Sequence, residues 1–169
     1  MKIKRSPPPP FAFLLRHPAH LIACGFGSGL APVAPGTFGT LFAWFSYSFL
    51  RGWLPDDAAF AVFLLLAFAL GVTACQIAGR NLGMADHGVI VWDEIVPFWA
   101  VLFMTPETLL WQFAAFLWFR FYDVVKPPPA RWFDTRMKNG LGVMMDDVVA
   151  AAYTVFTLAL FMALFERLA

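Results

Sequence analysis

Five carboxylates in this chain could act together on one ligand. Asp93-Glu94 stands where an apolar stretch begins, Asp123 follows another such stretch, and Asp146-Asp147 precedes a third. Carboxylates at a helix start can simply cap the helix or complement its dipole. An acidic pair entering an apolar run at membrane depth is costly, however, and is a functional-site hypothesis. Oxygen ligands alone favour Mg²⁺ or another hard cation over zinc, which predicts a Mg²⁺ site suited to phosphoryl chemistry.

Two cations flank one of these carboxylates. Arg120, Asp123 and Lys126 fall within seven residues, just before Pro127. Arg120 and Asp123 are three residues apart and share a helix face, so an ion pair is one interpretation. The other is a phosphate site, in which both cations hold phosphate oxygens next to a metal ligand.

A glycine-rich segment at 25–40 precedes the first long apolar stretch. It holds five glycines and two prolines, with hydroxyls from Ser28, Thr37 and Thr40. Glycines let backbone N–H groups turn toward one point and let a ligand approach closely, and a helix that starts near Thr37 would direct its positive end there. The segment matches neither a Walker A loop nor a dinucleotide fingerprint. It is either a phosphate cradle or an irregular connector between closely packed helices. Its candidate ligands for phosphate are Gly27, Ser28, Gly29, Gly36 and Thr37.

The histidines and cysteines carry weaker signals. His87 is predicted to be a polar loop residue, and His17 and His20 are predicted to lie on the surface. Cys24 and Cys75 imply no disulfide framework and are expected to be free residues that pack in apolar surroundings.

Composition places the chain in a lipid bilayer. Hydrophobic residues make up 60% and charged residues 14% of its 169 residues, against about 45–50% and about 25% in soluble domains. A soluble domain of this length could not hide so much apolar surface. The net charge of +1 gives no general attraction to nucleic acid.

Five apolar stretches predict an all-α, small polytopic membrane helical bundle. They run over about 37–53, 58–78, 95–104, 109–119 and 148–164. A span needs about 20 residues, with a range of about 17–25, so the first, second and fifth qualify. The third and fourth are short and are predicted to form a helical hairpin, either two short spans or one re-entrant pair. Residues 1–19 are expected to be a Pro-rich cytoplasmic leader, and 20–169 a single membrane domain.

The basic residues predict the orientation. If the chain starts in the cytoplasm and all five stretches cross, ten basic residues lie inside and only Arg51 and Arg167 lie outside. This is a strong positive-inside bias. The ten are Lys2, Lys4, Arg5, Arg16, Arg80, Arg120, Lys126, Arg131, Arg136 and Lys138. The glycine-rich, acidic and 120–147 segments then share the cytoplasmic face, where one site could draw on all three.

Four motifs in this order resemble the phosphatidylglycerophosphatase A family: GFGSGLAPVAPGTFGT, VIVWDEIV, FRFYDVVKPPP and LGVMMDDVVAA. The resemblance covers about residues 20–168. It implies an all-helical, Mg²⁺-dependent lipid phosphatase of the bacterial inner membrane, which hydrolyses phosphatidylglycerophosphate to phosphatidylglycerol and phosphate. Its expected partners are therefore the phospholipid substrate and the bilayer, with no obligatory protein partner and no nucleic acid.

The resemblance also implies roles for individual residues. The family's acidic residues correspond to Asp86, Asp93, Glu94, Asp123, Asp146 and Asp147, its basic pair to Arg120 and Lys126, and its glycine loop to 25–37. Two mechanisms stay open: attack by water with an aspartate taking the proton, or an aspartyl-phosphate on Asp123. The chain departs from the family at Pro97, expected near the first turn of a helix, and at Ala150–Ala152, where a glycine is usual.

One alternative belongs to a different class. A small transporter or ion-binding helical protein would also carry intramembrane carboxylates. Here the carboxylates gather at helix entrances rather than in mid-span, and no inverted repeat is visible, which favours the enzyme.

Overall fold

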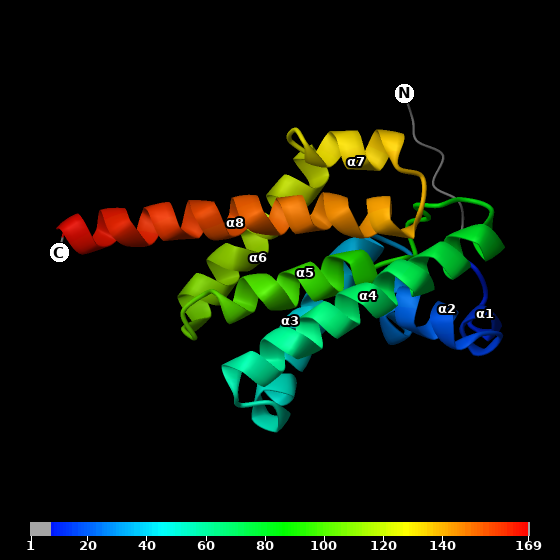
Figure 1. The fold of residues 1–169 in the computed structure, drawn as a ribbon, viewed down its shortest axis with the longest axis horizontal. Coiled ribbons are helices and arrows are strands. Elements are labelled where there is room, and N and C mark those ends of the chain that lie inside the picture. Colours follow the sequence, from blue (N-terminus) through cyan, green and yellow to red (C-terminus); the bar gives the residue numbers. More distant parts are fainter. Residues whose placement is uncertain (1–7, 169) are drawn as a thin grey trace.

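The computed structural model describes residues 8–168, without the side chains of Asp134 and Leu168, and every regular element in that range is helical (Figure 1). Two short helices come first, followed by a 3-10 segment, η1. Two long helices, a short pair and two final helices complete the chain. The elements are α1 (Ala12–Leu15), α2 (Pro18–Ala23), η1 (Gly25–Leu30), α3 (Pro35–Trp53), α4 (Asp57–Leu82), α5 (Trp92–Phe103), α6 (Leu109–Val125), α7 (Ala130–Arg136) and α8 (Gly140–Leu168).

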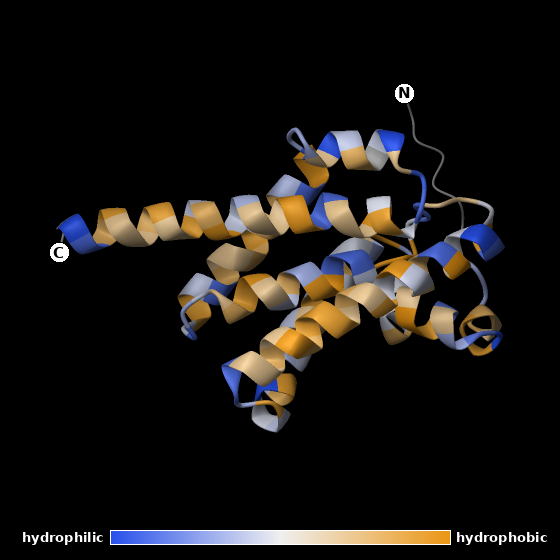
Figure 2. Cartoon of the chain, viewed as in Figure 1, coloured by the Kyte–Doolittle hydropathy of each residue, from blue (hydrophilic) through white to orange (hydrophobic). Residues whose placement is uncertain are grey.

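Each of the five apolar stretches forms a helix at its predicted place, but only two have the length and apolarity of a membrane span. These are α4 and α8, which are mostly apolar along their lengths in Figure 2. The expectation that the first stretch also qualifies is not met, because α3 contains Gly, Ser, Tyr and Trp among its apolar residues and ends with Arg51 in its last turn. Helices α5 and α6 have 12 and 17 residues, as expected for a short hairpin.

Helix α8 begins earlier than predicted, which changes the meaning of its acidic pair. The helix starts at Gly140, and the N–H of Gly142 donates to the Asn139 side chain at 2.9 Å. Asp146-Asp147 was expected to open this helix, and that prediction is wrong: the pair lies in its second turn and is buried. A capping role is therefore excluded for this pair, because the orphan N–H groups of a helix belong to its first turn.

Helix α5 is the buried centre of the bundle. Nine of its 12 residues are buried, and it packs against α3, α4, α6 and α8. The indole N–H groups of Trp92 and Trp99 donate to the carbonyls of Ala67 and Ala43. Pro97 lies inside α5 rather than near its first turn, so the carbonyl of Asp93 receives no helical hydrogen bond from position 97.

The end of the predicted leader packs on the bundle. Helices α1 and α2 contact each other, and α2 contacts α4. His20 is 3% exposed, so its predicted surface position is wrong: its ring stacks on Phe13 at 4.0 Å between centroids. His17 is exposed, as expected.

Both cysteines are free and buried, which confirms their predicted packing role.

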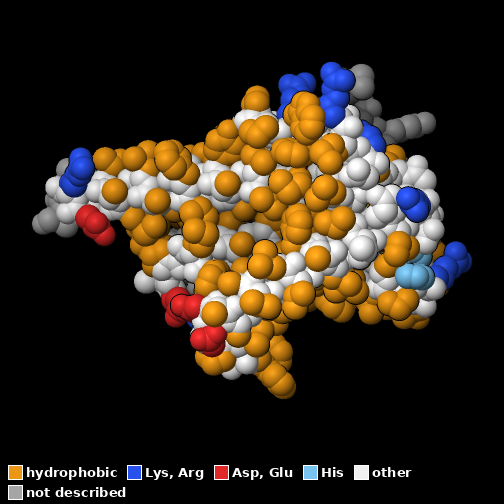
Figure 3. Space-filling view, viewed as in Figure 1, with side chains coloured by type: hydrophobic (Ala, Val, Ile, Leu, Met, Phe, Trp, Pro, Cys, Tyr) orange, Lys and Arg blue, Asp and Glu red, His pale blue; other side chains and the backbone are white. Residues whose placement is uncertain are grey.

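Charge is divided between the two ends of the molecule. In Figure 3, most Lys and Arg side chains gather at the end that carries α1, α2 and α7, whereas the Asp and Glu side chains of this face lie toward the opposite end, together with a basic side chain near the C-terminus. The surface between them is dominated by hydrophobic side chains. This distribution fits an apolar belt between two polar faces, with the basic face on the side predicted to be cytoplasmic.

We expect Lys138→Cys, in a chain whose Cys24 and Cys75 are replaced by alanine, to resist a membrane-impermeant maleimide in intact cells and to react after permeabilisation. Gly52→Cys is the matched control, because a side chain there meets no atom within 4 Å and the α3–α4 turn is predicted to be outside. Labelling of Lys138→Cys in intact cells would contradict the predicted orientation.

Candidate active site

The glycine-rich segment holds the start of α5 in place. An added Cβ at Gly29 would lie 2.1 Å from the carbonyl oxygen of Val89, and one at Gly39 would lie 2.7 Å from Val91. At Gly36 it would lie 1.9 Å from Oε1 of Glu94. These three glycines therefore let the segment and α3 approach residues 89–94 more closely than any other residue type would allow.

Glu94 and Asp123 meet at a single guanidinium. Nη1 of Arg120 lies 2.7 Å from Oε2 of Glu94 and 2.7 Å from Oδ2 of Asp123. Thr40 joins them, since its Oγ1 is 3.3 Å from the same Glu94 oxygen and 3.4 Å from Nη1. Helices α3, α5 and α6 thus converge on one charged cluster whose side chains are mostly buried. The ion pair between Arg120 and Asp123 that the spacing allowed is present, and it includes a second carboxylate.

Lys126 pairs with Asp146 across α6 and α8. Lys126 is the C-cap of α6 and adopts a left-handed conformation, with φ of 48°, which non-glycine residues seldom adopt. Burial alone would lower the pKa of Lys126, but the charge and hydrogen bond of Asp146 raise that pKa above its usual value. The lysine therefore remains a cation at neutral pH and offsets the charge of Asp146.

Two further carboxylates, Asp93 and Asp147, add negative charge to this region. Asp93 and Asp147 are 6% and 3% exposed, and Oδ1 of Asp147 is buried without a hydrogen-bond partner among the described residues. Electrostatic interactions couple Asp147 to Asp123, Asp146, Asp93 and Glu94. Five clustered carboxylates thus face two cations, Arg120 and Lys126. A buried charge without compensation is costly, so this arrangement favours either a proton on one of the carboxylates or additional positive charge beside them.

The donor set fits a hard divalent cation in its chemistry. Carboxylate oxygens are the ligands that Mg²⁺ prefers, and the unpartnered oxygen of Asp147 is of this type. Within the described residues, no three His, Cys, Asp or Glu side chains are already gathered as a metal site, because Glu94, Asp123 and Asp146 are turned toward Arg120 and Lys126. These carboxylates would have to turn away from the two cations to bind a metal.

The remaining candidates lie at the edge of the cluster. Asp86 is exposed in the loop between α4 and α5 and acts electrostatically on Asp93 and Lys126. His87 lies in the same loop, as predicted, and is 6% exposed. Its Nδ1 accepts from the N–H of Val89 at 3.3 Å, and burial lowers its pKa.

The predicted phosphate cradle divides into two parts. Ser28 donates its hydroxyl to the carbonyl of Gly25 at 2.8 Å, and Gly27 adopts φ of 105° in η1, so this part stabilises its own turn. Gly36 and Thr37 lie in the first turn of α3, with Gly36 directly against Glu94. The second part is the one that reaches the charged cluster.

Two features of the site were not assigned from the sequence. Thr40 was noted for its hydroxyl, but its contact with Glu94 and Arg120 was not foreseen. Gln76 was overlooked: its Oε1 accepts from the N–H of Gly140 at 2.8 Å and so fixes the start of α8 against α4. The signal for a structural role of Gln76 was its polar side chain within an apolar stretch, four residues before Arg80.

Comparison with known proteins places the chain in a family. The sequence model of phosphatidylglycerophosphatase A matches residues 21–162. A phosphatidylglycerophosphatase A of Haemophilus influenzae is 47% identical over 143 residues, 83% of this chain and 86% of that protein. One from Escherichia coli is 42% identical over 140 residues, 80% of this chain and 78% of that protein.

A third relative carries a different substrate in its name. It is a Bacteroides thetaiotaomicron protein, provisionally named a phosphatidylinositol-3-phosphatase, and is 40% identical over 149 residues, 82% of this chain and 90% of that protein. No solved structure matches the chain. The family match covers all the carboxylates and both cations of the cluster, and the chain belongs to the phosphatidylglycerophosphatase A family.

Proposed function

We propose that this chain is a membrane-associated lipid phosphatase that hydrolyses phosphatidylglycerophosphate to phosphatidylglycerol and inorganic phosphate. Family membership supports the substrate. The observation that carries the chemistry is that five carboxylates and two cations from α5, α6 and α8 lie close enough to interact electrostatically, with ion pairs at Arg120 and at Lys126. A phosphate monoester needs cations for its oxygens and a carboxylate for the proton of the attacking water.

Arg120 is suited to bind the phosphate. Its Nη1 is engaged by Glu94, Asp123 and Thr40, whereas its other guanidinium N–H groups donate to none of the described residues. A guanidinium anchored through one nitrogen is held in orientation and can present the remaining donors to two phosphate oxygens. Lys126, held by Asp146, adds a second positive charge from the same end of α6.

The carboxylates of α5 and α8 would hold Mg²⁺. Asp93, Asp147 and Asp146, with Glu94, supply the oxygen donors, and the excess of carboxylates over cations supports this assignment. When bound, the ion would offset charge on the phosphoryl oxygens. Asp123 is held by the guanidinium that would bind phosphate, and we assign it to accept the proton of the attacking water.

An apolar groove begins where the carboxylates end. A cavity of about 390 Å³ is lined by Pro129, Val148, Val149, Ala152, Tyr153 and Phe156. Val148 directly follows Asp147 in α8, and Pro129 lies three residues after Lys126. The hydroxyl of Tyr153 donates to the carbonyl of Pro128 at 2.7 Å, which ties the groove to the loop after Lys126. A substrate with a polar phosphate and an apolar chain would fit here, with its phosphate at the charged cluster and its chain in the groove.

The proposed location follows from the same geometry. The chain would cross the bacterial inner membrane several times, with the charged cluster on the cytoplasmic side. The basic end of the molecule in Figure 3 supports this orientation. The acyl chains of the substrate would stay in the bilayer while its phosphate reaches the cluster.

Purified protein in detergent should release phosphate from phosphatidylglycerophosphate when Mg²⁺ is present. Excess EDTA should abolish the release, and Mg²⁺ added back should restore it, because hard oxygen ligands favour this ion. Colorimetric phosphate determination is the measurement. Full activity in excess EDTA would contradict the metal assignment but not the phosphatase activity.

Glu94→Gln should lower kcat by at least about 100-fold, a barrier increase of about 2.7 kcal/mol. Glutamine keeps the shape beside Gly36 but loses the charge that would bind a hard cation. Arg120 retains Asp123 as its partner, so the protein should fold, as its thermal unfolding would show. Glu107→Gln, the same change at an exposed residue, is the control. Activity of Glu94→Gln within about tenfold of the wild type would remove Glu94 from the ligands.

Arg120→Lys should lower kcat/KM by about 10- to 100-fold, the range expected when one charge-assisted hydrogen bond of about 1.5–3 kcal/mol is lost. An ammonium can satisfy Glu94 and Asp123 but cannot also hold two phosphate oxygens. Steady-state kinetics of Arg120→Lys beside Arg131→Lys, an exposed control on α7, measure this. Normal kinetics with an unchanged melting temperature would leave Arg120 a purely structural ion-pair partner.

A further inference from the structure

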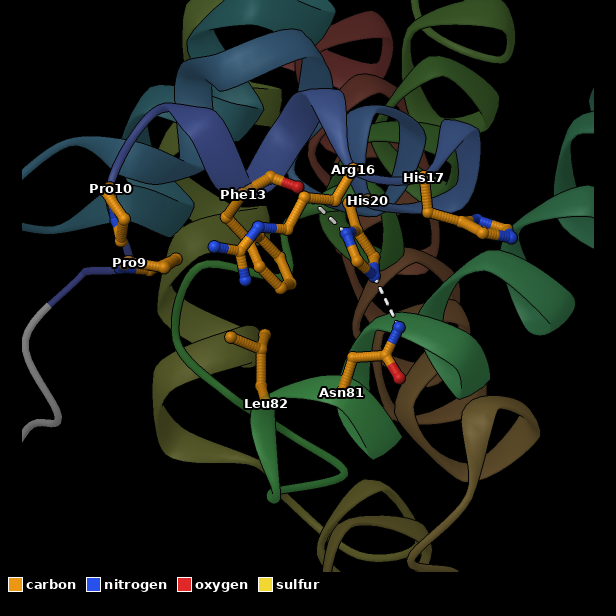
Figure 4. A pocket seen from close by; sticks show the side chains of 8 residues that line it. All are labelled: Pro9, Pro10, Phe13, Arg16, His17, His20, Asn81 and Leu82. Atoms are coloured by element: carbon orange, nitrogen blue, oxygen red, sulfur yellow. Dashed lines mark hydrogen bonds between the residues drawn. The ribbon is translucent and has the colours of Figure 1, made fainter.

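A second cavity, lined by both polar and apolar residues, lies at the corner between the N-terminal helices and the end of α4. It encloses about 590 Å³ and is lined by Pro9, Pro10, Phe13, Arg16, His17, His20, Asn81 and Leu82. None of these residues belongs to the charged cluster of α5, α6 and α8. In Figure 4, Phe13, His20, Asn81 and Leu82 surround the opening, Arg16 turns toward it, and His17 points away.

The polar wall of the cavity is held rigidly. Nδ1 of His20 lies 2.9 Å from the carbonyl oxygen of Phe13, and its Nε2 lies 2.7 Å from Nδ2 of Asn81. With both ring nitrogens engaged, His20 ties α2 to α1 and to the end of α4. The wall is therefore formed before any ligand arrives, which reduces the entropic cost of binding.

Arg16 provides the charge for a ligand. It is exposed and forms no ion pair with any residue that the structure describes. The residues that line the cavity include Arg16 and two histidines but no carboxylate. An anion would gain a charge-assisted hydrogen bond there, whereas the ammonium of a zwitterionic headgroup would find no acidic partner among the lining residues.

The cavity lies at the depth of lipid headgroups. With the middle of α4 (Asp57–Leu82) at the bilayer midplane, Asn81 lies about 17 Å from that plane at about 1.5 Å per residue. This is just beyond the hydrocarbon half-thickness of about 15 Å. Phe11, the N-cap of α1, and Leu15, its last residue, are 65% and 73% exposed, so apolar side chains lie near Arg16, as in segments that lie in the membrane interface.

We propose that this corner binds the phosphodiester headgroup of an anionic phospholipid, at a site separate from the active site. Arg16 holds the phosphate, the Phe13–His20 wall contacts the headgroup, and Phe11 and Leu15 enter the acyl layer beside it. Because α2 leads directly into the glycine-rich segment, and the carbonyl of Ala23 accepts from the N–H of Val91 at 2.9 Å, a lipid bound here would brace the element that positions Glu94.

The test uses the full chain in detergent and native mass spectrometry, with phosphatidylserine or phosphatidylcholine added. Phosphatidylserine is an anionic phosphodiester and not a phosphate monoester, so it reports on this site independently of turnover. We expect one phosphatidylserine to be retained per chain in preference to phosphatidylcholine. Arg16→Gln should weaken this binding by at least about tenfold, which corresponds to about 1.4 kcal/mol. Arg136→Gln, the same change at another exposed arginine, should leave it within about twofold.

A second variant keeps the charge of Arg16 and fills the cavity instead. Pro9→Trp should reduce phosphatidylserine retention in the same way, because the ring would occupy the cavity. In an assay where phosphatidylglycerophosphate is the only anionic lipid present, Arg16→Gln should still release phosphate from it, so the two proposals can fail separately. Equal retention of both lipids, or equal losses in Arg16→Gln and Arg136→Gln, would overturn the site. Displacement of phosphatidylserine by excess inorganic phosphate would show a site for free anions rather than for lipid.

Discussion

The pairing of buried carboxylates with Arg120 and Lys126 is the interaction on which the rest of the structure depends. Unpaired charges in an apolar interior are costly, and this bundle buries several of them. Each cation bridges helices that are distant in sequence: Arg120 connects α6 to α5, and Lys126 connects α6 to α8. The remaining negative charge is what makes the cluster suitable for a cation and a phosphate rather than only for stability.

Small residues make this pairing geometrically feasible. Gly36 lets α3 lie against the carboxylate of Glu94, and an added Cβ at Gly140 would lie 2.0 Å from the backbone oxygen of Val72 in α4. These contacts bring helix backbones together where larger side chains would separate them. The glycine-rich segment therefore serves at least two purposes, since part of it packs and part of it borders the charged cluster.

The sequence was sufficient to locate the five apolar helices and to group the carboxylates that the structure brings near Arg120 and Lys126. Asp93, Glu94, Asp123, Asp146 and Asp147 could be grouped because each stands near the edge of an apolar stretch, and hydropathy detects such edges well. Hydropathy could not locate the start of α8, because Asn139 and Gly140 are residue types typical of turns. The hydrogen bonds that fix this start come from the Asn139 side chain and from Gln76 in α4.

Contacts between distant segments were similarly out of reach. The burial of His20 depends on its stacking with Phe13 and its bond to Asn81, and neither follows from local spacing. The role of Thr40 depends on Arg120, 80 residues away in the sequence. Such pairings require the three-dimensional arrangement, since residue type alone predicts only that a hydroxyl or an imidazole needs a partner.

The continuity of α8 also bears on which distance between phosphate and acyl chain the substrate must have. Asp146-Asp147 and the groove residues Val148 to Phe156 lie on one continuous helix, so no hinge separates the polar site from the apolar one. The separation between the two is then a fixed length, set at about 1.5 Å per residue along the helix. This fixed separation favours ligands whose phosphate and acyl chain are one short, defined headgroup apart. A soluble phosphate monoester has no acyl chain to occupy the groove.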